Sequence, residues 1–567
     1  MTQTTGDPQV AELAERYWRF ICDEFPVNAL LAGQATQEAA LFRESEADYD
    51  RRHAKAGELL AEVSQLTSPS LRAQDRATLG LLRRELEAIR SFHETLSHYR
   101  PSLYPAGPDF MTVFLAQSIS FADLQSAVRY VERFASVPAF IEDLKSNLRA
   151  GHRLGIRYPK VVLERAAAAV RAPLGGAVED SPWYGPFRRS PNAGTEGVRR
   201  VGEVMRRIIE RDLRPALAAY ADFLRGELAR GARDTISCTD APQGMEFYEL
   251  QVRYFTTTDM TPEAVHQIGL EEVARLTAET RKVAAAAGFP EVSRYQQFLA
   301  TDPQFIVSSR EVLLEKMESL AKRIDKHIPS FFGRIPRITY GVECMTEALS
   351  ASMPPAYAQP STGDRTAPGI LWVSGLPARC PTYMHLPLAL HEGWPGHLMH
   401  IALMQEGKDL PAFRRHGAVK YTACVEGWAL YCEELGEEMG LYRTPHQHYG
   451  RLNMEIWRAA RLVADTGIHS QGWSRERAVE YMAHHVTLDR GAIEAEVDRY
   501  AGMPGQALAY QIGNRAFRAL RQRAEAALGD RFKLRDFHDT LLAAGPVTLP
   551  ILEDLCEDWL ARQAVVH

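Results

Sequence analysis

Hydrophobic residues recur three and four positions apart over much of the chain, and this spacing predicts a mostly α-helical protein. It is clear in 11–32, 51–97, 121–150 and 196–230, where it places the apolar side chains on one face of a helix. Serine, proline and polar residues near 66–75 divide the second of these segments into two helices, which we expect to be antiparallel. Most of the chain after residue 381 has the same helical period.

Three positions carry residues that begin helices. Thr261-Pro262-Glu263 combines an N-cap side chain with a proline at the first helical position, where no helical hydrogen bond is lost. Ser474 and Thr487 are further N-cap candidates. These signals predict that helices begin at these three places.

Strand signals are few, so we expect only a small β element. The segment 245–255 alternates partly, and 336–342 and 369–375 are short, rich in β-branched or aromatic residues, and bounded by Gly and Pro. A Pro- and Gly-rich loop is predicted at 353–369. The segment 369–375 is interpreted in two ways: as an edge strand to which a peptide adds, or as one arm of a hairpin with 336–342.

Composition and charge exclude several classes of protein. The 567 residues are 46% hydrophobic and 24% charged, which is typical of a folded protein with a large core and excludes a mainly disordered, collagen-like or coiled-coil chain. Lys and Arg number 66 against 72 Asp and Glu, for a net charge of −6. No basic run interleaved with aromatic residues occurs, so we expect no nucleic-acid partner.

The sequence also predicts a cytoplasmic protein. No apolar run approaches the ~18 residues of a membrane span, so no membrane association is expected. The N-terminal segment has neither the basic start nor the apolar stretch of a signal peptide. The seven cysteines are scattered, odd in number and without CxxC spacing, which is typical of free thiols in a reducing compartment.

The segment 388–400, LALHEGWPGHLMH, is the most informative part of the chain. It brings His391, Glu392, His397 and His400 together in the sequence. A catalytic zinc site needs imidazole and carboxylate ligands, one open position for water, and a nearby base that is not a ligand. The usual helical arrangement is H-E-x-x-H, in which the two histidines lie one turn apart.

The spacing here differs from that motif. His391 and His397 are six residues apart, which is about 240° around a regular helix, so they would not share a face. Pro395-Gly396 lies between them, and a proline disrupts the hydrogen bond to the carbonyl four residues back. We therefore expect a break that returns His397 to His391. The alternative on a regular helix pairs His397 with His400, and a chance grouping of histidine and glutamate is the competing explanation.

A second segment, 421–438, strengthens the metal hypothesis. Glu426 begins an apolar, tryptophan-bearing helix 29 residues after His397, about where helical zinc peptidases have a third ligand. Glu433 lies seven residues further on a similar face, where it could hold a ligand imidazole or belong to a solvated acidic face with its neighbours. We assign that acidic face to the remaining glutamates, Glu434, Glu437 and Glu438.

Long motifs along the chain resemble the DUF885 family. The segments HEGWPGH and VEGWALY, together with 461–482 and 496–513, are similar to family motifs, and so are 17–34 and 354–374. Members of that family resemble helical zinc-dependent metallopeptidases. The resemblance implies a single catalytic unit over 1–567 with its catalytic motifs in 350–520, although the Pro/Gly/Ser-rich stretch 171–194 is either a long surface loop or an internal boundary.

Carried over residue by residue, the resemblance implies a complete site. His391, His397 and Glu426 correspond to ligands of one zinc ion, and Glu392 to the general base. This chain has His400 where family members often have Gln, and Trp394 where they have a smaller residue. His400 could be a further ligand or contact one, and Trp394 could narrow the pocket.

Downstream residues are candidates for stabilising negative charge in the reaction. Asp465 and His469 are four apart on one helical face, either as a local surface pair or with His469 as donor to an oxyanion. Tyr500 and Tyr510 are tyrosine candidates for that role. We predict His469 as the first choice of donor and Tyr510 as the second. Arg461 and Arg499 are either solvated or receive a substrate carboxylate.

The combined prediction is a mostly α-helical metallopeptidase with a deep central cleft, acting on short peptides through activated water and a glutamate base. The first alternative is a zinc amidohydrolase that cleaves a non-peptide amide in specialised metabolism. The second is a helical ligand-binding protein without catalytic activity. Two histidines and a glutamate also suit Mn²⁺, Co²⁺ or Fe²⁺, and the sequence does not indicate an oligomeric state.

Overall fold

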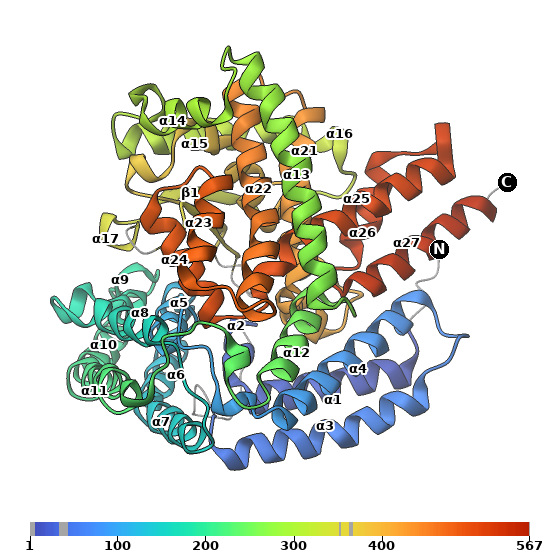
Figure 1. Cartoon of the computed structure of the whole chain (residues 1–567). Helices are drawn as coiled ribbons and strands as arrows, with labels where there is room; N and C mark the ends of the chain where they lie inside the picture. The colour runs from blue at the N-terminus through green and yellow to red at the C-terminus, as the bar shows by residue number, and fades with distance from the viewer. Residues whose placement is uncertain (1–5, 33–42, 351–352, 362–366, 566–567) are drawn as a thin grey trace.

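The chain folds into packed α-helices around one small sheet (Figure 1), as the hydrophobic spacing predicts. The computed structural model describes residues 6–32, 43–350, 353–361 and 367–565. The first helices are α1 (Pro8–Glu24), α2 (Pro26–Leu31), α3 (Glu46–Leu66), α4 (Ala73–Glu94), α5 (Pro108–Ser118), α6 (Leu124–Phe134), α7 (Val137–Arg153), α8 (Lys160–Arg171), α9 (Pro186–Arg189), α10 (Glu196–Ile208), α11 (Arg214–Arg225), α12 (Gly244–Thr256) and α13 (Pro262–Ala286). They are followed by α14 (Val292–Thr301), α15 (Arg310–Asp325), α16 (Ile328–Phe331), α17 (Glu347–Ser350), α18 (His385–Glu392), α19 (His397–Glu406), α20 (Ala412–His416), α21 (Thr422–Glu438), α22 (Pro445–His469), α23 (Arg475–His485), α24 (Arg490–Gly502), α25 (Ala509–Leu528), α26 (Leu534–Ala543) and α27 (Leu549–Val565).

Most helix boundaries follow local sequence signals. The predicted helical pair in 51–97 is α3 and α4, which pack together. Thr261 accepts a hydrogen bond from the amide of Ala264 at the start of α13, and Ser474 accepts one from Arg477 at the start of α23. The N-cap prediction for Thr487 is wrong, because α24 begins after Asp489, whose side chain accepts from the amide of Ala492.

The strand prediction for 245–255 is also wrong, because this segment is α12. Its partial alternation coincides with a helical pattern in which Phe247, Tyr248 and Val252 are buried. A short apolar segment fits both periods, and packing against the rest of the fold decides between them.

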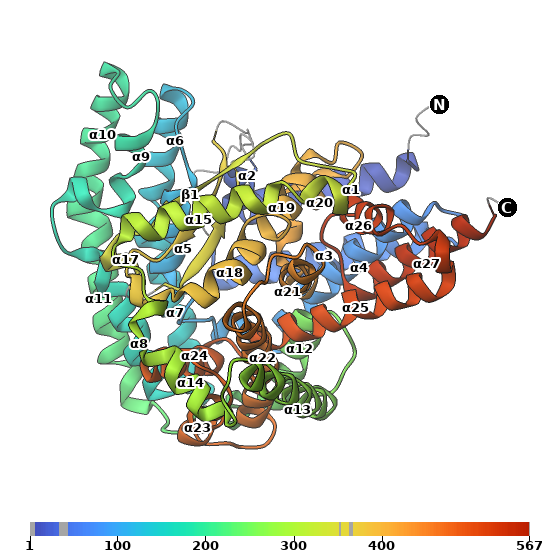
Figure 2. The ribbon, with the colours of Figure 1, turned by 90° about the horizontal axis from the view of Figure 1, so that it is seen from above.

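The core of the C-terminal half is formed by long helices that pack closely. The helices α13 and α22 lie side by side, both running through the middle of the molecule in Figure 1 and seen near end-on in Figure 2. The helix α21 packs against α25 and α18. At the α21–α25 crossing Gly427 meets Gly513, and a side-chain carbon at Gly427 would overlap the backbone of Gly513. This close approach fixes α21, the helix that carries Glu426.

The small sheet has three strands in the order β1-β3-β2: β1 (Tyr340–Cys344), β3 (Gly369–Val373) and β2 (Ala356–Gln359). Both predicted strand segments are therefore present, but β1 and β3 pair in parallel, so the predicted hairpin is wrong. β3 is the central strand, since β2 pairs antiparallel with its other side. It has no free edge for a peptide, and that interpretation is wrong as well. Part of the predicted loop 353–369 forms β2, and its residues 362–366 lie outside the described residues.

The segment 171–194 is not an extended surface loop. It contains several 3₁₀ turns and α9, and Trp183 and Phe187 within it are buried. Whether it marks an internal boundary stays a prediction. Over the described ranges of the chain, none of the helices has both the length and the apolar character that crossing a bilayer requires.

Candidate metal centre

The predicted helix break lies between His391 and His397. α18 ends at Glu392 and α19 begins at His397, so the chain turns within four residues. The indole Nε1 of Trp428 on α21 donates a hydrogen bond of 2.9 Å to the carbonyl of Pro395, which ties the turn to that helix. The imidazole rings of His391 and His397 then lie 4.8 Å apart, centre to centre, and nearly perpendicular.

Three side chains converge at this break. The carboxylate oxygen Oε2 of Glu426 lies 3.4 Å from Nε2 of His391 and 3.3 Å from Nε2 of His397. One potential ligand atom from each residue lies within 4.8 Å of the other two. The histidines come from α18 and α19 and the glutamate from α21. The sequence motif therefore becomes a compact group of two imidazoles and one carboxylate.

The two separations from Glu426 Oε2 match a tetrahedral cation site. Ligands that lie 2.0–2.1 Å from zinc at tetrahedral angles are about 3.3 Å from one another, close to those distances of 3.4 Å and 3.3 Å, and the two histidine nitrogens lie within 4.8 Å of each other. Glu426 Oε2 is buried and forms no hydrogen bond with the described residues. Leaving a buried carboxylate oxygen unbonded is costly, and a cation between the three donors would remove that cost.

The orientation of His391 is set by a second carboxylate. Its Nδ1 lies 2.8 Å from Oε1 of Glu433, which is 1% exposed. Nδ1 therefore carries a proton, and Nε2 is the ring nitrogen that faces Glu426. Burial lowers the pKa of His391, but the neighbouring carboxylates of Glu426 and Glu433 outweigh burial and raise that pKa to about 9. The two carboxylates thus favour positive charge at this point.

Glu392 lies beside the donors without belonging to their group. It lines the cavity next to them, and none of the residues that the structure describes forms a hydrogen bond with its carboxylate. Burial raises the pKa of Glu392, while His391 and His397 lower it less strongly. A carboxylate with a raised pKa and free oxygens is suited to accepting and returning a proton.

His400 and Trp394, the two residues that differ from the family pattern, lie outside the site. His400 is not part of the donor group, and burial, followed by His397, lowers its pKa to about 3, so it is neutral. It packs near the Trp428 ring, with the ring centres 5.9 Å apart. Trp394 does not narrow the cavity, because it packs on Tyr340 instead of lining it.

His469 is not placed to stabilise an oxyanion. It is buried away from the cavity lining, its Nδ1 accepts from the amide of Cys238, and its Nε2 donates to the carbonyl of Tyr500. Both ring nitrogens are thus occupied. Asp465 does not pair with it either, since it accepts from the hydroxyl of Tyr248 and the amide of Gly505. The Asp465–His469 spacing therefore reflects helix packing, and we correct the catalytic prediction for His469.

The remaining candidates divide into two groups. Tyr500 is buried outside the cavity and its hydroxyl donates to Glu496. Tyr510 lines the cavity, and among the described residues its hydroxyl accepts a hydrogen bond only from Gln506 Nε2, at 3.5 Å. Arg461 and Arg499 both line the cavity and both pair with Glu496. Of the two tyrosines, only Tyr510 is in a position to reach a substrate.

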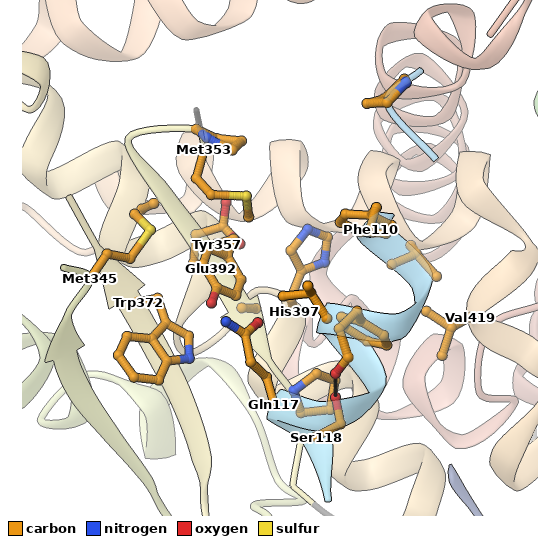
Figure 3. A pocket seen from close by; sticks show the side chains of 18 of the residues that line it. Phe110, Gln117, Ser118, Met345, Met353, Tyr357, Trp372, Glu392, His397 and Val419 are labelled. Carbon is orange, nitrogen blue, oxygen red and sulfur yellow. Dashed lines mark hydrogen bonds between the residues drawn. The ribbon is translucent and has the colours of Figure 1, made fainter. Parts of the chain in front are cut away.

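A cavity of about 2170 Å³ leads to the donor group. Figure 3 shows part of its lining, which includes Glu392 and His397 together with Phe110 and Gln117 from α5. Tyr357 of β2 and Arg458 of α22 also line it. No local signal in the sequence indicates these residues, because α5 and β2 reach the cavity only through tertiary packing. Arg458 was recognisable only as one more arginine on a helix.

The comparisons with known proteins agree with this fold. The family model described as "Bacterial protein of unknown function (DUF885)" matches residues 26–555. A protein from Colwellia psychrerythraea, described as a candidate lipoprotein, is 24% identical, with 98% of this chain and 99% of that chain covered and a TM-score of 0.89. A candidate lipoprotein of unknown function from Shewanella oneidensis is 16% identical over 96% and 99% of the two chains, with a TM-score of 0.73.

A third solved structure, an M32 carboxypeptidase from Deinococcus radiodurans R1, is 14% identical over 99% of this chain and 98% of that chain, at a TM-score of only 0.41. No curated protein matches the sequence significantly. The first two structures support the fold. The cytoplasmic location of this chain stays a prediction.

Proposed function

The chain belongs to the DUF885 family, and we propose that it is a metal-dependent hydrolase that cleaves amide bonds of short peptides. One observation carries the proposal: His391, His397 and Glu426 offer three ligand atoms within 4.8 Å of one another, beside the free carboxylate of Glu392. Two imidazoles, one carboxylate and an adjacent base form the set that metal-assisted amide hydrolysis uses. Zn²⁺ fits this set best, although other divalent ions accept the same ligands.

The protein residues would have distinct tasks. A cation in this site would lower the pKa of coordinated water towards ~7 and polarise the scissile carbonyl. Glu392 would take a proton as the water attacks, and would return it to the leaving amine. The raised pKa that burial gives Glu392 supports the second step, because a weaker acid holds the proton until the amine needs it. Glu433 would keep the His391 ring in position.

Tyr510 is the residue that we propose as donor to the developing oxyanion. It lines the same cavity as the donor group, and Gln506 at 3.5 Å is the nearest polar partner of its hydroxyl. A hydroxyl without a strong partner is free to donate where negative charge develops. His469, with both nitrogens occupied, is not proposed for this role.

The cavity supports a substrate of peptide size. Its volume of about 2170 Å³ exceeds the ~300–1,000 Å³ of pockets for drug-sized ligands. Apolar side chains such as Phe110 and Val113 line it together with polar ones such as Gln117. An extended chain of several residues with mixed side chains suits this lining.

The test is to incubate zinc-loaded protein with a panel of short peptides and to measure the free amines that hydrolysis releases. We expect cleavage that a chelator abolishes and added Zn²⁺ restores. Cleavage of acyl-amide metabolites with no cleavage of any peptide would support the non-peptide amidohydrolase instead. Absence of activity on both panels by protein with bound zinc would contradict a hydrolase.

A further inference from the structure

Arg458 is a buried cation on the cavity wall, and none of the described acidic residues forms an ion pair with it. Its residue is 5% exposed, and no carboxylate of the described residues lies within 4.0 Å of its guanidinium. Nη1 donates to the carbonyl of Met454 in the preceding turn of α22, and Nε forms no hydrogen bond. An arginine does not lose its proton in proteins, so its charge stays in the cavity wall. Buried charges are normally paired, and this one lacks such a pair.

The neighbouring arginines differ in this respect. Arg461, one turn further along α22, donates through Nη2 to Glu496 at 2.8 Å, and Arg499 also pairs with Glu496. The sequence-based alternative in which Arg461 and Arg499 receive a substrate carboxylate therefore named two residues that already have an acidic partner. Arg461 still has Nε and Nη1 buried and unbonded. It can add a hydrogen bond to a ligand that Arg458 holds.

Aromatic rings hold both guanidinium groups in place. The centre of the Trp457 ring lies 4.7 Å from the Arg458 guanidinium carbon and 4.5 Å from that of Arg461. The Tyr510 ring lies 6.0 Å and 4.6 Å from the same two carbons. Cation–π contacts of this kind restrict long arginine side chains. The two groups are thus positioned before a ligand arrives, which reduces the entropy that binding loses.

This pair of arginines faces the same cavity as the metal donors. Arg458, Arg461, Glu392 and Glu426 all line it. The charges of Glu433 and Glu426 act on Arg458, but neither carboxylate is within ion-pair distance of it, and Glu433 is engaged with His391. A counter-ion to Arg458 can therefore come from a ligand in the cavity.

We propose that Arg458, assisted by Arg461, binds the C-terminal carboxylate of the substrate while the scissile amide lies at the His391–His397–Glu426 centre. The substrates are then short peptides with a free C-terminus, cut close to that end. This inference rests on the proposed function for the cleavage step, but the binding step is independent of it. A planar guanidinium matches a carboxylate through two parallel N–H donors. A side-chain carboxylate has the same chemistry, so the test separates the two sources.

The first experiment measures binding without cleavage. Zinc-loaded Glu392→Gln protein is titrated by calorimetry with the tripeptide Ala-Ala-Phe, its C-terminal amide, and the amide of Ala-Glu-Phe. We expect the free acid to bind about 10- to 100-fold more tightly than Ala-Ala-Phe amide, the range for a hydrogen-bonded charge. Adding Arg458→Met should reduce that preference to less than about twofold. If the amide of Ala-Glu-Phe binds as tightly as the free acid Ala-Ala-Phe, a side-chain carboxylate is sufficient, and the assignment of the site to the C-terminal carboxylate is overturned.

Two further variants keep the result interpretable. Arg129→Met removes another half-buried arginine of the cavity lining, on α6, and should leave the preference unchanged. Arg458→Lys keeps the charge but cannot offer two parallel N–H donors, so we expect an intermediate preference for the free acid. This variant serves as the test if Arg458→Met folds poorly. An Arg458→Met protein with wild-type thermal unfolding and an unchanged preference for the free acid would overturn the proposal.

Cleavage rates separate this inference from the proposed function. Wild-type protein that binds the free acid selectively but cleaves neither peptide supports the carboxylate site and contradicts the hydrolase. Protein that cleaves the free acid and the amide at equal kcat/KM supports the hydrolase and contradicts the carboxylate site. Selective cleavage of the free acid that disappears in Arg458→Met supports both.

Discussion

Replacing Glu392 by Gln is expected to lower kcat for peptide hydrolysis by about 10³-fold, the middle of the range for loss of a general base. The substitution keeps the shape of the side chain but removes the proton acceptor. Glu392 is not part of the donor group, so bound zinc should stay at the wild-type level. Initial rates with a saturating peptide, measured beside the zinc content of the same samples, check both statements.

The matched control for this variant is Glu406→Gln. Glu406 lies at the end of α19, pairs with Arg337 and does not line the cavity. The same chemical change there should alter kcat by less than about twofold, because Glu406 neither lines the cavity nor belongs to the donor group. A Glu392→Gln protein that holds zinc and keeps wild-type kcat would show that another group accepts the proton.

The second large effect is expected from Gly396→Ala. A side-chain carbon at this position would overlap the carbonyl oxygens of His391 and Leu390, both backbone atoms that cannot move without shifting α18. Overpacking of this kind costs about 3 kcal/mol of unfolding free energy. Because the turn sets the position of His397 relative to His391, zinc affinity should also fall by about 100-fold, the upper range for displaced ligands. Chemical denaturation and zinc titration measure the two effects.

Gly194→Ala is the control for the second effect. Gly194 is exposed, and no atom lies within 4 Å of an added side-chain carbon. Its stability should change by less than about 0.5 kcal/mol. Gly396→Ala protein with unchanged stability and zinc affinity would mean that the turn between α18 and α19 tolerates a side chain and does not define the site.

The part of the site that could be predicted from the sequence lies close together along the chain. Pro395-Gly396 interrupts a helix for reasons that local geometry contains, and the turn between α18 and α19 follows from it. Glu426 could be anticipated because α21 is long, apolar and near in sequence. The helical fold itself follows from the period of the apolar residues, which is a local property.

The remaining parts depend on contacts between distant segments. The spacing of Asp465 and His469 shows that they share a helix face, but not that this face packs against Tyr248 and Cys238 instead of the cavity. In the same way, Arg458 and Arg461 look alike in the sequence. Only the position of Glu496 on α24 distinguishes the paired arginine from the unpaired one.

The missed strand has a similar cause. β2 lies in a Pro- and Gly-rich segment whose composition favours a loop. Its four residues become a strand because β3 offers an edge for pairing, and β propensity depends strongly on such context. Tyr357, which β2 brings to the cavity, was therefore beyond local reasoning.

The most direct test of the central claim is the zinc content of purified protein, measured by elemental analysis after equilibration with Zn²⁺ and removal of the excess. We expect about one tightly held ion per chain in the wild type, as a single site with two imidazoles and one carboxylate implies. In His391→Ala, which takes away one ligand of the convergent group, we expect almost none. A wild-type protein without zinc, or a His391→Ala protein that holds as much as the wild type, would contradict the account.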